Sequence, residues 1–344
     1  MIVPRPALTV LLTCLSLALV AAVPAVQEGP LPFPDSTITV KTDDCQFFVR
    51  GRCVLPRNAK VALLRRARVE GNPGKGEDGA VEEAVIEVSG TLELKAVTGG
   101  NVILRNVWLE LTPECKSIYL ADVNFVGGGG IRASEKGAST ADVYIENVEF
   151  TGGATLSMAC SAGTITVSSV HADAPAALIG APRSERADSK ANIRVLNCQG
   201  GSRGEWKGMA GGLTMTGVKS AVVQFSYLGG KASRFADNGK LSFQGNNVQS
   251  KLIEFEYSRP GQFKKAAVSG CDFRSDEVRF LAPINGTKTE RVAVKDCWFT
   301  SGTDAEAILT KQVLDTTRNE KSSAAVSLKK IKEAPVGLGG NASR

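Results

Sequence analysis

Three side chains that can carry protons lie close together in the middle of the sequence. Glu146 and Glu149 flank Asn147 within ADVYIENVEFTGG, residues 141–153, and His171 is the single histidine of the chain. Carboxylates on one surface can act as general acid and base, and a histidine titrates near neutral pH. These three side chains are therefore candidates for catalysis or ligand binding, and an ordinary charged surface is the competing interpretation.

Three aromatic residues are the candidates for holding a carbohydrate. Tyr119 and Tyr144 occupy equivalent positions in neighbouring repeats, so their rings could hold a sugar or cover each other. Trp206 lies in the glycine-rich loop GGSRGEWKGMAGG, residues 200–212, beside charged residues. It is equally suited to contact a sugar and to plug the end of a folded coil.

These residues must be positioned by a short phrase that recurs along the chain. Apolar and polar residues alternate, then a corner residue interrupts the alternation and a small apolar residue follows. The units are NVILRNVWLEL, SIYLADVNFVG, DVYIENVEFTG, TITVSSVHADA, NIRVLNCQGGS, GLTMTGVKSAV, KLSFQGNNVQS, KAAVSGCDFRS and RVAVKDCWFTS. Strand alternation with a repeated corner predicts short β-strands and excludes helical repeats.

The corner residues are of types that tolerate a left-handed backbone. They are Asn106, Asp122, Asn147, Ser169, Asn197, Gly217, Gly245, Gly270 and Asp296. The next position should point into a shared core, and it holds Val107, Val123, Val148, Val170, Cys198, Val218, Asn246, Cys271 and Cys297. We expect Asn246 to satisfy its amide inside the core.

The phrase resembles the repeat of the right-handed parallel β-helix of the pectate-lyase-like superfamily, over residues 84–311. The resemblance implies an all-β solenoid of about nine or more coils whose outward faces and loops carry function. An antiparallel β-sandwich is the competing fold, and it would show hairpin turns and strands of unlike character.

The best-known enzymes of that superfamily have motifs that this chain does not contain. Pectate lyases use clustered acidic calcium ligands and an arginine, and polygalacturonases use Asn-Thr-Asp, paired aspartates, Gly-His-Gly and Arg-Ile-Lys. Here His171 stands in Val-His-Ala. The sequence therefore favours a non-catalytic binding or structural protein of the cell envelope or exterior, with polysaccharide or an envelope protein as partner. The alternative is a polysaccharide lyase or glycoside hydrolase that uses acids around Glu146 and Glu149.

The N-terminus predicts export. Arg5 precedes an uncharged apolar run, residues 7–23, and small residues near position 25 allow cleavage. An uncleaved membrane anchor is the competing interpretation. We expect a signal peptide at residues 1–25, an N-terminal segment and cap at 26–95, the β-helix at 96–314 and a C-terminal tail at 315–344. The mature protein would be secreted, periplasmic or on the cell surface, without a membrane span.

The cysteines and the net charge indicate no further functional site. Seven cysteines follow the signal, and Cys45 and Cys53 are the best candidates for a disulfide; Cys271 with Cys297 is a lesser one. No CxxC spacing supports zinc, and we expect neither a metal nor another cofactor. The net charge of +6 is spread over mixed acidic and basic residues, and no motif supports nucleic-acid binding.

Overall fold

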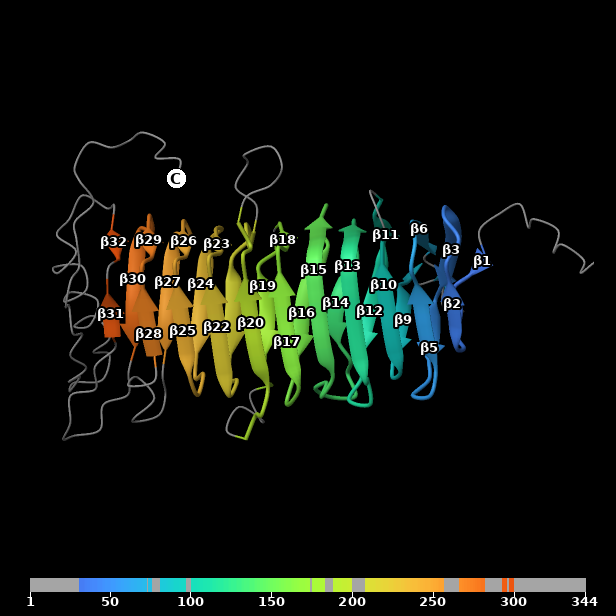
Figure 1. The fold of residues 1–344 in the computed structure, drawn as a ribbon, viewed down its shortest axis with the longest axis horizontal. Coiled ribbons are helices and arrows are strands. Elements are labelled where there is room, and N and C mark those ends of the chain that lie inside the picture. The colour runs from blue at the N-terminus through green and yellow to red at the C-terminus, as the bar shows by residue number, and fades with distance from the viewer. Residues whose placement is uncertain are drawn as a thin grey trace, which may run out of the picture.

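The computed structural model describes residues 31–72, 74–75, 81–96, 100–173, 175–182, 188–199, 208–256, 266–281, 293–295 and 297–299. In these residues the chain forms a rod of stacked coils, with β1 near one end and β32 at the other (Figure 1). Each coil contributes a strand to up to three parallel faces, and the described part contains no α-helix. The fold is an all-β parallel β-helix. None of the described residues forms a helix able to cross a bilayer.

The faces are defined by their strands. The first face contains β2 (Ile38–Val40), β5 (Lys60–Leu63), β10 (Thr91–Lys95), the first half of β13 (Ser117–Val126) and of β15 (Asp142–Thr151), β17 (Thr164–Ser168), β20 (Asn192–Leu196), β22 (Ser220–Gln224), β25 (Leu241–Gln244), β28 (Ala266–Ser269) and β31 (Ala293–Lys295).

The second face contains β1 (Leu31–Pro32), β3 (Cys45–Arg50), β6 (Ala67–Asn72), β11 (Val102–Arg105), the second halves of β13 and β15, β18 (His171–Ala172), β23 (Tyr227–Leu228), β26 (Asn247–Val248), β29 (Asp272–Phe273) and β32 (Trp298–Phe299). Met209 links β18 to β23 through isolated bridges to Ala172 and Leu228.

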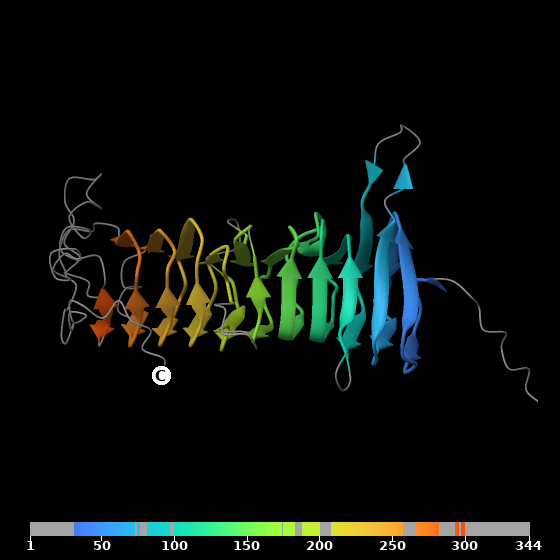
Figure 2. The same ribbon diagram turned by 90° about the horizontal axis from the view of Figure 1, so that it is seen from above.

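The third face contains β4 (Arg52–Leu55), β9 (Ala84–Val88), β12 (Val107–Leu111), β14 (Gly130–Ala133), β16 (Thr155–Ala159), β19 (Ala177–Gly180), β21 (Leu213–Thr216), β24 (Ala232–Ala236), β27 (Leu252–Glu256) and β30 (Glu277–Leu281). A short antiparallel hairpin, β7 (Gly74–Lys75) with β8 (Val81–Glu82), projects from the rod between the second and third faces (Figure 2).

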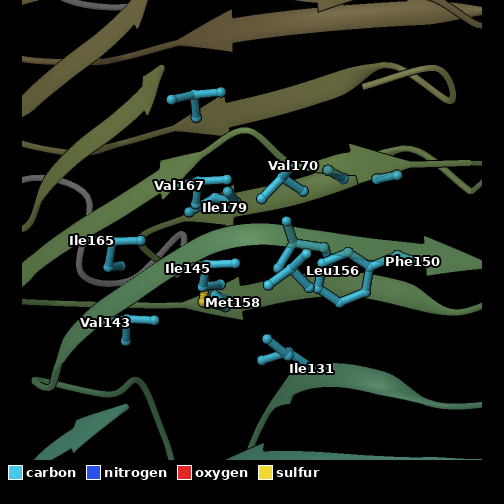
Figure 3. Packing of buried hydrophobic residues seen from close by; sticks show 14 of the residues in the cluster. Ile131, Val143, Ile145, Phe150, Leu156, Met158, Ile165, Val167, Val170 and Ile179 are labelled. Atoms are coloured by element: carbon cyan, nitrogen blue, oxygen red, sulfur yellow. The ribbon is translucent and has the colours of Figure 1, made fainter. Parts of the chain in front are cut away.

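The core runs along the inside of the rod because alternate residues of every strand point inward. Val143 and Ile145 of the first face and Leu156 and Met158 of the third face lie inside the same coil (Figure 3). Identical side chains stack from coil to coil, as Phe125 and Phe150 do with ring centroids 4.8 Å apart and ring planes 2° from parallel. One coil cannot bury this surface alone, so the stack is the unit of stability.

The corner prediction is confirmed for the corners that the structure describes. The backbone φ angles of Asn106, Asp122, Asn147, Ser169, Asn197, Gly217, Gly245 and Gly270 lie between 51° and 65°. The positions that follow them are buried, and Asp296 lies outside the described residues. Asn246 is 1% exposed, accepts the amide of Ser226 at 3.0 Å and donates to the carbonyl of Val223 at 2.9 Å. Its amide is satisfied internally, as expected.

Two repeat units lie on other faces than the aligned phrase indicates. The unit ending at Asn106 belongs to the second face, because its strand β11 pairs with the second half of β13. The unit ending at Gly217 is strand β21 of the third face. Strands of all three faces alternate apolar and polar residues and end at similar left-handed corners. The repeated sequence therefore predicts that a corner is present but not which two faces it joins.

The stacking also begins earlier than the sequence indicates. Parallel pairing starts with Leu31 beside Phe47, so coils already form within the residues expected to be an N-terminal segment and cap. Parallel pairing on all three faces contradicts the β-sandwich alternative. The predicted signal peptide and the C-terminal tail lie outside the described residues.

Candidate functional site

Tyr119 and Tyr144 meet on the first face. They are register partners on β13 and β15, and their rings stack with centroids 5.1 Å apart and planes 12° from parallel. The Tyr144 hydroxyl donates to Glu146 Oε2 at 3.0 Å, and this hydrogen bond raises the pKa of Tyr144 above its ordinary value. Lys95 Nζ lies 5.8 Å from the Tyr119 ring centroid.

This arrangement weakens the case for a sugar platform at the tyrosines. An aromatic ring holds a sugar through its open face, and here the facing sides of the two rings cover each other. Lys95 lies against Tyr119 as well. The Tyr144 hydroxyl is already engaged, because it donates to Glu146.

Glu149 and His171 meet on the second face, across the Asn147 corner from Glu146. Glu149 and His171 are register partners on β15 and β18. The His171 Nε2 lies 3.0 Å from Asp173 Oδ1, and Nδ1 lies 3.3 Å from the amide nitrogen and 3.2 Å from the carbonyl oxygen of Gly208. Whichever ring nitrogen carries the proton, each nitrogen faces a polar group of the protein.

The three candidate acid–base residues therefore do not form one constellation. Glu146 lies on the first face, and Glu149 and His171 lie on the second. Both ring nitrogens of His171 are engaged by the protein, and its side chain is only 15% exposed. A general base needs a nitrogen that can reach the substrate proton, and His171 offers none in this arrangement.

The remaining predicted site residues do not add to either group. Trp206 lies outside the described residues. Cys45 and Cys53 are free, so the predicted disulfide is not formed. The Gly51 corner separates their strands. The Cys45 sulfur lies 3.4 Å from the Thr42 carbonyl, and the Cys53 sulfur lies 3.8 Å from the Phe33 carbonyl. Cys271 is buried beside Cys297, and this burial raises its thiol pKa.

A cavity of about 400 Å³ lies on the second face near the N-terminal end of the rod. Its lining includes Gln46, Arg68 and Ile103, which are in register on β3, β6 and β11, and Asp44, Arg66 and Asn101, which precede those strands. Arg66 Nη2 lies 3.3 Å from Asp44 Oδ2, whereas Arg68 has no ion-pair partner among the described residues. An added Cβ at Gly100 would lie 2.1 Å from Arg66 Cγ, so this glycine makes room for the arginine.

Comparison with models of known protein families, with curated proteins and with solved structures finds no match.

The third face holds a charged network that the sequence patterns did not reveal. Glu87 and Glu110 are register partners on β9 and β12, and each residue is 4% exposed. Arg52 Nη1 bridges them at 3.0 and 2.8 Å. Lys136 contacts the other oxygen of Glu87, and Arg132 Nε lies 3.0 Å from the other oxygen of Glu110. All four carboxylate oxygens therefore face a cation.

The cations of this network favour the ionised form of Glu110. Burial by itself raises the pKa of Glu110, but hydrogen bonds from Arg52 and Arg132 outweigh burial and lower that pKa below its ordinary value. Arg132 also lies over the ring of Trp108, 4.9 Å from its centroid, so this aromatic face is covered. Among the described residues, no group of three or more His, Cys, Asp or Glu side chains is placed to hold a metal ion.

The cavity and the network escaped the sequence patterns for different reasons. The cavity joins Asn101 and Ile103 of the first recognised repeat unit to two coils that precede it, although the apolar alternation of residues 67–70 offered a signal for such a coil. The network joins residues on separate coils, Arg52 with Glu87 and Glu110. Only the register of the third face reveals that these side chains meet.

Proposed function

We propose that the chain is an exported, non-catalytic β-helical protein that binds polysaccharide through the cavity on its second face. The observation that carries this proposal is the lining of the cavity. The Arg68 guanidinium, which has no ion-pair partner in the described part of the chain, lies there with the amides of Gln46 and Asn101 and the apolar side chain of Ile103. The likeness of the repeat to pectate-lyase-like proteins supports a carbohydrate ligand. The apolar segment at residues 7–23 supports export.

The chemistry of the lining favours a sugar that bears a carboxylate or sulfate group. The Arg68 guanidinium can pair with such an oxyanion through two parallel hydrogen bonds. The Gln46 and Asn101 amides can donate to and accept from ring hydroxyls, and Ile103 offers an apolar surface to the sugar carbons. The cavity falls within the size range of small-ligand sites.

The non-catalytic part of the proposal rests on the candidate acids. Glu146 and Glu149 lie on opposite sides of the Asn147 corner, and both His171 nitrogens are engaged. In the charged network, the oxygens of Glu87 and Glu110 already face cations.

Binding is tested by isothermal titration of the full chain with an acidic polysaccharide such as polygalacturonate, with dextran as the neutral comparison. We expect Arg68→Ala to weaken polygalacturonate binding by about tenfold, which equals about 1.4 kcal/mol. Arg194→Ala is the matched control, because Arg194 is an exposed arginine on the first face, and it should bind like the wild type. Equal loss in both variants would show a general charge effect and overturn the cavity assignment.

Catalysis is tested on the same glycans by measuring reducing ends and unsaturated products. We expect no turnover by the wild-type protein. Turnover that disappears in Glu146→Gln or Glu149→Gln would establish the lyase or hydrolase alternative and overturn the non-catalytic proposal.

A further inference from the structure

Phe225 occupies a corner that other coils fill with small or polar residues. It lies between β22 and β23 with a φ of 50°, and 50% of the residue is exposed. The equivalent corners of neighbouring coils are Asn197, Gly245 and Gly270. A bulky residue in the left-handed region is a conformational outlier that costs folding free energy. Its ring is half exposed, so packing recovers only part of that cost.

The ring is seated on the corner of the next coil. A Cβ added to Gly245 would lie 2.7 Å from Cδ1 and Cε1 of Phe225, so Gly245 makes room for one edge of the ring. At the following corner, an added Cβ on Gly270 would have its nearest neighbour 3.9 Å away. Gly270 therefore leaves the surface of its corner, one coil beyond Gly245, uncovered by a side chain.

Uncharged amides lie on both sides of the Phe225 corner. On the first face, Gln224 Nε2 donates to Gln244 Oε1 at 3.3 Å. On the second-face side, Gln199 Nε2 reaches past the coil of Phe225 to the carbonyl of Gly245 at 3.4 Å. Gln199 and Gln244 are exposed, and Gln224 is half-buried. The group thus combines a half-open aromatic ring with hydrogen-bonding groups that carry no charge.

We propose that Phe225 is a platform for an uncharged pyranose ring of a polysaccharide. The C–H groups of a pyranose face pack against an aromatic ring, and the amides of Gln199, Gln224 and Gln244 can donate to and accept from its hydroxyls. With no charged side chain in this group, a neutral sugar fits better than an acidic one. This site shares no residue with the Arg68 cavity and does not depend on it.

The test is isothermal titration of the full chain with cellohexaose. Asparagine fills the equivalent corner one coil earlier, so Phe225→Asn removes the ring and keeps a residue that tolerates the backbone. We expect wild-type binding to weaken by at least about tenfold in Phe225→Asn and by less than about threefold in Phe225→Tyr. Phe225→Gly provides a second variant with a residue found at the next two corners.

A matched control separates this platform from general apolar contact. Leu178 on β19 of the third face is 46% exposed, so Leu178→Asn removes a comparable apolar surface elsewhere and should bind cellohexaose like the wild type. Absence of wild-type binding, full binding by Phe225→Asn and Phe225→Gly, or an equal loss in Leu178→Asn would overturn the proposal. Thermal unfolding of each variant checks that a loss of binding is not a loss of fold.

Discussion

The corner between the first and second faces is built differently in the coils of β13 and β15, in the N-terminal half of the rod, and in the coils of β20, β22 and β25, in the C-terminal half. In the N-terminal half, β13 and β15 run through Asp122 and Asn147 without a break. In the C-terminal half, β20, β22 and β25 end before the corner, and β23 and β26 on the second face are two residues long. The left-handed corner residue therefore lies within a continuous strand in β13 and β15, and it follows the end of a strand in β20, β22 and β25.

The interiors of these two sets of coils differ accordingly. Behind the continuous corners the inward residues are Val123 and Val148, both fully buried. In the C-terminal half, Cys198, Ser226 and Asn246 accept the amides of Val170, Cys198 and Ser226 at 3.4, 3.4 and 3.0 Å. Each polar side chain thus satisfies a backbone donor of the coil before it. Where strand pairing stops at this corner, inward polar side chains therefore take over the backbone donors.

The apolar interior of the N-terminal half should be the more sensitive to truncation. Phe150→Ala removes a ring that is fully buried and stacked on Phe125, and we expect a loss of about 3–5 kcal/mol in the free energy of unfolding. Chemical denaturation measures it. Tyr144→Ala on the outside of the same strand is the control and should cost less than half as much. Equal losses would show that the interior does not dominate stability here.

Removing one hydrogen-bond acceptor from the polar interior of the C-terminal half should lower the free energy of unfolding. Asn246→Leu leaves the Ser226 amide and the Val223 carbonyl without their partner, and we expect a loss of about 2–4 kcal/mol in the free energy of unfolding. Gln244→Leu in the same coil changes an exposed amide and should lie within about 0.5 kcal/mol of the wild type. A neutral Asn246→Leu variant would contradict the role given to these side chains.

At this corner, replacing Phe by Asn in one coil and Asn by Phe in another should change the free energy of unfolding in opposite directions. Phe225→Asn relieves a bulky left-handed residue and should raise the free energy of unfolding by about 1 kcal/mol. The reverse exchange, Asn147→Phe, should lower it by about 1–2 kcal/mol. Thermal unfolding with a known enthalpy measures both. A loss of stability in Phe225→Asn would show that the ring serves the fold.

The smallest expected effect concerns the tyrosine pair. The hydrogen bond to Glu146 raises the pKa of Tyr144 in the folded state above that of the unfolded chain, where tyrosine titrates near about 10. This stabilisation is present below that pH and is lost as the pH rises through the folded pKa. Titration of phenolate absorbance should show one tyrosine moving to lower pH in Glu146→Gln. An unchanged titration curve would show that Glu146 does not control Tyr144.

The local features of the fold could be predicted from the amino-acid sequence alone. Alternation predicted the strands, residue type predicted the left-handed corners such as Asn147, and the position after the corner predicted the buried column that includes Asn246. These features depend on a few neighbouring residues, through side-chain direction and the sterics of the backbone, and therefore leave a local signature.

Only the tertiary structure decided which residues meet. The register between coils placed Gly208 against His171, joined Arg52 to Glu87 and Glu110, assigned Asn106 and Gly217 to other faces, and put Phe225 at a corner where the repeat shows Asn or Gly. The physical reason is that coils of unequal length stack through main-chain hydrogen bonds between distant segments. Neither the loop lengths nor the pairing partners are encoded in the alternation.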